Sequence, residues 1–242
     1  QTQQTDPLQW IDQYRNRFKV PDLEGLPRFV GGLVGYFGYD TIRYVEPRLG
    51  KCLNPDEFGT ADIVLMLSTE ILVFDNLKGS VYIVVLAAAE DDGFTSAESR
   101  IDELALGLQN NVPLSPLTVH DGDVPELDFV SGFSEAGFKD AVVKAKQYIA
   151  AGDVMQVVLS QRLNADFKGN AIDVYMYYLN MGDFEIVGSS PEILVRQEDD
   201  EVTVRPIAGT RPRGKNEQQD YALEKELLAD PKELAEHLML ID

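Results

Sequence analysis

The sequence predicts an α+β protein that combines antiparallel sheets with packed helices. Short β-rich runs are joined by tight connections, and such connections force neighbouring strands to run antiparallel. Segments with helical spacing of apolar residues and clear N-cap signals stand between and after these runs. The chain has 242 residues, 44% of them hydrophobic and 26% charged, which is the composition of a globular protein. A chain of this length can bury a sizeable core.

Residues 1–108 are expected to form a sheet-rich N-terminal segment. Glycines interrupt the apolar stretch 29–40, which is typical of a buried strand with close backbone neighbours. The runs 63–67, 70–74 and 81–86 predict antiparallel strands, and the last two are joined by a hairpin connection ending at Gly79. A capping box at Thr95–Glu98 predicts a helix from about residue 96 to residue 108.

Residues 109–130 have the irregular Pro- and Asn-rich sequence of a linker, and residues 131–242 are expected to form a second segment. In that segment Ser134 is expected to cap a helix that ends at Gly152. A strand is predicted over 154–163, followed by short strands at 175–180, 184–188, 193–196 and 201–205. Two closing helices are expected to begin near Asn216 and after Asp230.

Charge and cysteine content exclude several classes of protein. The chain carries 21 Lys and Arg against 41 Asp and Glu, a net charge of −20 that would repel phosphate backbones and anionic lipid surfaces. No apolar run approaches the ~20 residues of a membrane span. Cys52 is the one cysteine, so no intramolecular disulfide can form, and the N-terminus shows no export signal. A cytoplasmic protein that binds neither nucleic acid nor membrane is expected.

The window 202–216 is the most unusual part of this acidic chain because it contains basic side chains and no acid. Arginine forks suit carboxylates and phosphates, and the Gly209–Thr210 pair adds a backbone N–H and a hydroxyl. An anion site and a solvated basic loop explain this window equally well. Its basic residues are Arg205, Arg211, Arg213 and Lys215.

The segment 209–216 also matches the sequence motif of a phosphate-binding loop at all but one position. Asn216 stands where such a loop needs a hydroxyl for magnesium, and Pro212 removes a backbone N–H from the phosphate cradle. Nucleotide binding is therefore the weaker interpretation.

Three further groups of residues are candidates for chemistry. Glu233, Glu236 and His237 share one face of the last predicted helix, and two carboxylates one turn apart can hold Mg²⁺, although a capping role and plain solvation explain them too. Glu192 follows a proline at the start of a strand, where it could act as a general acid or merely begin the strand. Gln156, with Ser160 and Arg162, would give its predicted strand a polar face.

Several motifs together resemble the large-subunit family of anthranilate synthases, which belongs with the chorismate-utilising enzymes. The resemblance covers nearly the whole chain and implies the fold of that family, a layered sandwich of antiparallel sheets with flanking helices. It also implies the reaction: ammonia adds at C2 of chorismate as the C4 hydroxyl leaves, and pyruvate is then eliminated to give anthranilate. The motifs are 29–47, 156–162, 187–192, 205–214 and 233–242.

The resemblance assigns roles to the candidate residues. Glu236 would ligate Mg²⁺ and Glu233 would support the metal through water. Gly209 and Thr210 would bind the substrate, and Glu192 would protonate the departing hydroxyl.

Two positions separate the members of this family by nucleophile. Related enzymes that add water have a Lys where this chain has Gln156, and aminodeoxychorismate synthases often have a Lys where it has Ala208. External ammonia from a glutamine amidotransferase subunit is therefore implied, in a hetero-oligomer. Aminodeoxychorismate synthase component I and, in another class, a nucleotide-binding or regulatory module are the alternatives.

The resemblance is also incomplete. Family members are longer, so the C-terminal part of the chorismate-binding domain, and with it half of the active site, is expected to be absent here. Residues 173–175 follow one another directly at a point where relatives have a short helix and a Pro-rich turn, so about three helical turns are expected to be missing here. Tyr175 and Met176 resemble the remaining rim of the pocket in which tryptophan acts as a feedback inhibitor. This stretch alone is therefore expected to be inactive.

Overall fold

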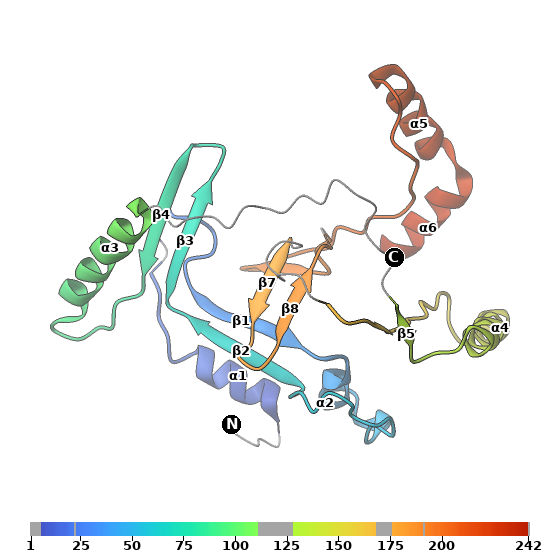
Figure 1. Ribbon diagram of the computed structural model, residues 1–242, viewed down its shortest axis with the longest axis horizontal. Helices are drawn as coiled ribbons and strands as arrows, with labels where there is room; N and C mark the ends of the chain where they lie inside the picture. The colour runs from blue at the N-terminus through green and yellow to red at the C-terminus, as the bar shows by residue number, and fades with distance from the viewer. Residues whose placement is uncertain (1–5, 22, 111–127, 168–175, 191, 242) are drawn as a thin grey trace. The chain divides into compact units, whose positions relative to one another are not determined.

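The computed structural model describes residues 6–21, 23–110, 128–167, 176–190 and 192–241 (Figure 1). The chain divides into two compact units, residues 1–123 and 124–242. Most of the predicted linker, 109–130, lies outside the described residues.

The first unit begins with helix α1 (Pro7–Arg15), followed by a two-stranded sheet. Asp6 caps α1 by accepting the Gln9 amide at 3.1 Å. Strand β1 (Gly32–Phe37) pairs antiparallel with β2 (Ile63–Ser68). A Cβ at Gly35 would come within 1.9 Å of the Val64 carbonyl oxygen, so this close pairing requires glycine. The Gly-rich stretch therefore forms the predicted strand, but most of its residues are half-buried rather than buried.

Short helical turns fill the chain between β1 and β2. They are η1 (Tyr39–Thr41), α2 (Ile42–Val45) and η2 (Pro47–Leu49). Arg43 Nε donates to Asp40 at 2.6 Å and its Nη1 donates to the Leu49 carbonyl at 2.9 Å. This arginine therefore ties the helical turns to one another.

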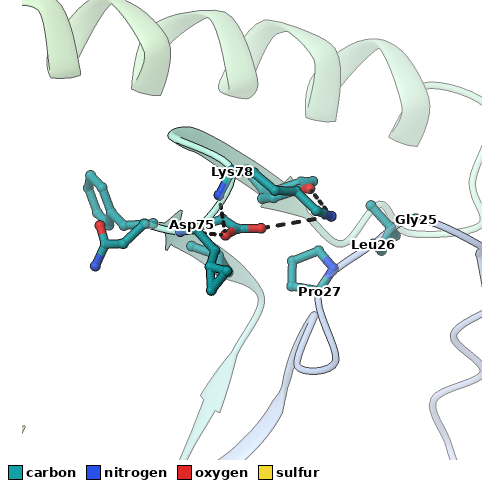
Figure 2. A pocket seen from close by; sticks show the side chains of 10 residues that line it. Gly25, Leu26, Pro27, Asp75 and Lys78 are labelled. Atoms are coloured by element: carbon teal, nitrogen blue, oxygen red, sulfur yellow. Dashed lines mark hydrogen bonds and ion pairs between the residues drawn. The ribbon is translucent and has the colours of Figure 1, made fainter.

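A regular hairpin follows, formed by β3 (Glu70–Asp75) and β4 (Ser80–Val85). Asp75 accepts the backbone amides of Leu77 and Lys78 at 3.1 and 3.0 Å, and Gly79 adopts φ +64° at the end of the turn. Both strands and their connection agree with the sequence prediction within one residue. The turn and the segment 25–27 line a pocket of about 430 Å³ (Figure 2). Lys78 Nζ lies 3.4 Å from the Tyr82 hydroxyl.

Helix α3 (Gly93–Gln109) lies beside this hairpin (Figure 1). The predicted capping box is wrong, because the helix begins at Gly93 after Asp92 and Thr95 lies inside its first turn. The Thr95 carbonyl instead accepts the Ser99 hydroxyl at 3.0 Å.

The second unit begins with β5 (Val130–Ser131), which pairs with β6 (Leu163–Asn164). Helix α4 (Glu135–Ala151) is capped by Ser134 and ends at Gly152 with φ +81°, as predicted. The predicted strand over 154–163 is wrong: only its last residue, Leu163, belongs to a strand. Residues 154–162 are irregular, because among the described residues none of the strand pairings includes them and supplies the ladder of hydrogen bonds that a strand needs.

Two hairpins and two helices complete the unit. Strand β7 (Tyr177–Asn180) pairs with β8 (Glu185–Gly188), and β9 (Arg196–Glu198) pairs with β10 (Glu201–Thr203). The strand predicted at 193–196 is shifted toward the C-terminus because the turn lies at residues 199–200, where Asp199 adopts φ +51°. Helices α5 (Glu217–Ala229) and α6 (Pro231–Ile241) begin at the predicted caps, Asn216 and Asp230.

The described elements therefore combine helices with antiparallel strand pairs, as the sequence predicts for an α+β protein. The expected core is missing from the described part of the chain, where Ala97 is the one buried apolar residue. Large side chains such as Phe37, Phe74 and Leu238 remain more than half exposed. Within the same residues, no helix combines the length and apolar character needed to cross a bilayer.

Candidate functional site

The loop between β10 and α5 lies against the start of α6. Gly209 in this loop adopts φ +80°, a conformation that favours glycine. A Cβ at this position would lie 2.9 Å from Glu233 Oε2 and 2.9 Å from Leu227 Cδ1. The loop backbone therefore meets the carboxylate of Glu233 without an intervening side chain. The predicted substrate-binding pair and one predicted metal carboxylate are thus neighbours.

Arg211 fastens this loop to both closing helices. Its Nε donates to Glu226 of α5 at 3.0 Å, and its Nη2 donates to Asp230 at 2.7 Å. Its Nη1 lies 3.7 Å from Glu233 Oε1 and donates to the Thr210 carbonyl at 3.1 Å. The Arg211 side chain is only 19% exposed, so these contacts are partly shielded from water.

Asp230 joins this ion pair to the beginning of α6. One of its oxygens accepts from Arg211, and the other accepts the Lys232 amide at 3.0 Å as the helix cap. The hydrogen bond from Arg211, followed by that from the Lys232 amide, lowers the pKa of Asp230 from its ordinary value. The same contact with Asp230, followed by that with Glu226, raises the pKa of Arg211.

Asp220 of α5 holds the next part of the loop. It accepts the Gly214 amide at 2.7 Å and pairs with the Arg213 guanidinium at 2.5 Å. The amide of Gly214 is the first cause, and Arg213 the second, of a lowered pKa at Asp220. The predicted surplus of positive charge is therefore reduced, because acids of α5 and α6 neutralise Arg211 and Arg213. Among the described residues no ion pair neutralises Arg205 or Lys215.

Glu192 reaches the same loop from the segment after β8. Its Oε1 accepts the Ile207 amide at 3.1 Å, and its own amide donates to the Ser190 hydroxyl at 3.5 Å. The proline that precedes it lies outside the described residues. Since Ile207 is two residues from Gly209, the predicted general acid and the predicted substrate-binding turn belong to one cluster.

Helix α6 presents Glu233, Glu236 and His237 as half-buried side chains. Glu233 and Glu236 are one turn apart, and two carboxylates with water suit a hard cation such as Mg²⁺. Within the described ranges no group of three or more His, Cys, Asp or Glu side chains forms a fuller metal centre. The donor chemistry therefore fits Mg²⁺ that keeps several water ligands, with Glu233 already partly engaged by Arg211.

Other predicted site residues are not joined to this cluster by the described hydrogen bonds. Gln156 lies in the exposed irregular segment between α4 and β6, so the predicted polar strand face with Ser160 and Arg162 is not formed. Met176 is 61% exposed and donates its amide to the Gly188 carbonyl at 2.8 Å. Tyr175 lies outside the described residues.

Sequence reasoning missed the acids that hold the basic loop, Asp220 and Glu226. The available signal for Asp220 is its position in the first turn of α5, directly after this loop. Glu226 lies near the other end of that helix, 15 residues from Arg211, and the sequence gives no such signal for it. The sequence predicts Asp230 as a cap but does not reveal its second role as the partner of Arg211.

Comparison with known proteins gives a consistent result. The family model described as "chorismate binding enzyme" matches residues 1–242. Anthranilate synthase component 1 of Pseudomonas aeruginosa is 50% identical over 250 residues, covering 98% of this chain and 51% of the relative. The protein of the same name from Neisseria meningitidis is 47% identical, with 98% and 50% coverage.

A solved structure gives the same match. The crystal structure of anthranilate synthase component I from Streptococcus pneumoniae TIGR4 has a TM-score of 0.79 and 32% identity, covering all of this chain and 54% of the solved chain. This likeness confirms the expected fold. The chain spans about half the length of the relatives that it matches. With the family model matched along its whole length, this chain is a member of the chorismate-binding enzyme family.

Proposed function

We propose that the complete protein containing this chain is the large component of an anthranilate synthase, converting chorismate and ammonia to anthranilate and pyruvate. The likeness to anthranilate synthase component 1 along 98% of the chain carries this proposal. The contact between the Gly209 turn and Glu233 supports it, because a turn that we expect to bind an anion lies beside a candidate metal carboxylate.

Each residue of the cluster has a task that its surroundings permit. The Gly209 backbone and the exposed Thr210 hydroxyl bind a carboxylate of the substrate. Glu192 is oriented by the Ile207 amide through one oxygen, and its other oxygen gives a proton to the departing C4 hydroxyl.

Glu236 and Glu233 hold Mg²⁺ in this proposal, Glu236 directly and Glu233 through water. When bound, the metal supplies positive charge that neutralises the ring carboxylate of chorismate. Arg211 leaves Glu233 with one oxygen free of its ion pair, which agrees with a supporting role.

Gln156 and Ala208 determine which nucleophile reacts. The amide of Gln156 cannot deprotonate water, and the methyl group of Ala208 cannot attack carbon. External ammonia therefore serves as nucleophile, and a glutamine amidotransferase subunit supplies it in a cytoplasmic hetero-oligomer. Tyr175 and Met176 belong in this proposal to the rim of a pocket for the inhibitor tryptophan.

The decisive experiment is an assay of the complete protein with chorismate, Mg²⁺ and an ammonium salt. Fluorescence of anthranilate is the expected signal, and chelation of the metal with EDTA should abolish it. Formation of aminodeoxychorismate or isochorismate would instead refute the assignment from Gln156 and Ala208. Calorimetry with ATP and Mg²⁺ should detect no binding, and binding would favour the nucleotide module.

A further inference from the structure

Arg211 contacts the Gly209–Thr210 turn, α5 and α6 with one side chain. Its guanidinium reaches carboxylates on both sides of the α5–α6 junction and also bonds the carbonyl of Thr210. A planar fork with several donors can make these contacts together, whereas an ammonium group is a single point charge. Arg211 thus fixes the turn relative to the first residues of α6.

The two carboxylate oxygens of Glu233 have different neighbours as a result of this connection. Oε1 is the atom near Arg211 Nη1, at 3.7 Å, while Oε2 is the atom that faces the Gly209 backbone. The Glu233 side chain is 18% exposed, so its orientation is restricted by its neighbours. In the described ranges no ion pair reaches Glu236 on the next turn.

Electrostatics gives Arg211 a second effect. Without its charge, Glu226, Asp230 and Glu233 would be three carboxylates near one point, and like charges this close repel each other. Repulsion would turn Glu233 away from its neighbours and would loosen the start of α6, which Asp230 caps.

We propose that Arg211 is a positioning residue for the metal and substrate site. It holds Glu233 beside the Gly209–Thr210 turn and engages one of its oxygens, which leaves Glu236 as the carboxylate for direct ligation. This inference rests on the proposed function, since it assumes that these two glutamates hold a divalent cation. It differs from a purely stabilising role, which would change the amount of folded protein without changing the affinity for the metal.

The test uses the complete protein and two readouts. Binding of Mn²⁺, as a probe for Mg²⁺, is followed by electron paramagnetic resonance without chorismate, and anthranilate formation is followed as a function of Mg²⁺ concentration. Arg211→Gln should weaken Mn²⁺ binding by about tenfold or more, as loss of a group that orients a metal ligand does. The Mg²⁺ concentration for half-maximal rate should rise by a similar factor.

Arg100→Gln is the matched control, because Arg100 also bridges two carboxylates on two elements. It should leave both metal constants within about twofold of the parent, a difference of ~0.4 kcal/mol. If Arg211→Gln also leaves Mn²⁺ affinity unchanged while the parent makes anthranilate, the positioning role is refuted and the proposed function stands. If the parent itself neither binds Mn²⁺ nor makes anthranilate, both proposals fall.

Asp230→Asn keeps the experiment decisive if Arg211→Gln does not fold. Asparagine caps helices as well as aspartate does, so this variant retains the start of α6 but loses the charge that pairs with Arg211. Weaker Mn²⁺ binding at parental helix content supports the positioning role. Parental Mn²⁺ affinity in a folded Asp230→Asn protein overturns it.

Discussion

Arg100 and Arg211 make similar contacts in two regions of the molecule, and the differences between them separate a surface ion pair from a candidate site. Arg100 of α3 forms a two-pronged pair with Glu70 at 2.8 and 3.0 Å and reaches Glu103 at 2.8 Å. Its side chain is 43% exposed, against 19% for Arg211. Because both arginines make hydrogen bonds of similar length, hydrogen-bond geometry alone does not distinguish the Arg100 cluster from the Arg211 cluster.

The difference lies in what else each cluster contains. Glu70 pairs α3 with the β3–β4 hairpin through Arg100, and Glu103 lies on the same helix as Arg100. The acids around Arg211 include the cap of α6 and a glutamate that faces the bare backbone of Gly209. An arginine cluster becomes a candidate site when its acids are placed against an open backbone turn.

The largest effect should come from Glu236→Gln, which removes the carboxylate expected to ligate the metal. Anthranilate formation by the complete protein should fall below detection, because an amide is a much poorer ligand for Mg²⁺ than a carboxylate. Thermal unfolding and circular dichroism should match the parent. Glu103→Gln, which removes a carboxylate from the Arg100 cluster, should keep full activity. Full activity in Glu236→Gln would refute the metal role.

A smaller effect is expected from Gly209→Ala, which adds a methyl group between the turn and Glu233. The strain of a positive φ and the close approach to Leu227 should together cost about 1–3 kcal/mol of folding free energy. The KM for chorismate should rise by at least tenfold, measured by the initial rate of anthranilate formation.

Gly79→Ala is the control for this change, because Gly79 has a similar φ of +64° but no atom within 4 Å of the added Cβ. It should lower the melting temperature and leave KM unchanged. Equal KM values in the two variants would show that the space beside Glu233 does not matter for substrate binding.

The comparison also shows what the sequence can predict. The β3–β4 hairpin and the caps at Ser134, Asn216 and Asp230 were predicted correctly because each depends on residues a few positions apart. The strand at 154–163 was predicted from composition, yet β structure also needs a partner strand, which local sequence does not reveal.

The site shows the same division. The motifs singled out Gly209, Glu192 and Glu233, which the structure brings to one loop. The pairing of Arg211 with Glu226 and Asp230 spans 15 and 19 residues, and charge counting alone treated that arginine as free. Residue types thus indicate the chemistry, whereas the pairing of charges in the loop depends on contacts between residues far apart in the sequence, which the sequence alone does not reveal.

The acid dependence of stability should differ between the two clusters. Arg211 lowers the pKa of Asp230, so this group stabilises the fold above its ordinary pKa of 3.8, and the stabilisation is lost as pH falls through its lower folded value. Asp230→Asn should therefore flatten the fall in stability below about pH 4, measured by urea unfolding at a series of pH values. Glu70→Gln should flatten it less, although Arg100 lowers the pKa of Glu70 in the same direction, because Asp230 also accepts two backbone amides. If Glu70→Gln flattened the acid dependence of stability more than Asp230→Asn does, the Arg100 cluster would contribute more to that dependence than the Arg211 cluster, against this prediction.

The smallest effect is expected from Arg100→Gln. Exposed ion pairs contribute little to stability, because water and salt screen them and ordering two long side chains opposes the attraction. The melting temperature of the complete protein should fall by no more than about 3 °C, and less in high salt. Arg211→Gln, measured in parallel by differential scanning calorimetry, should lower it further, since it leaves three acids without their shared cation. If the two losses are equal, partial burial adds nothing to the Arg211 cluster, and its importance must rest on the glycine turn alone.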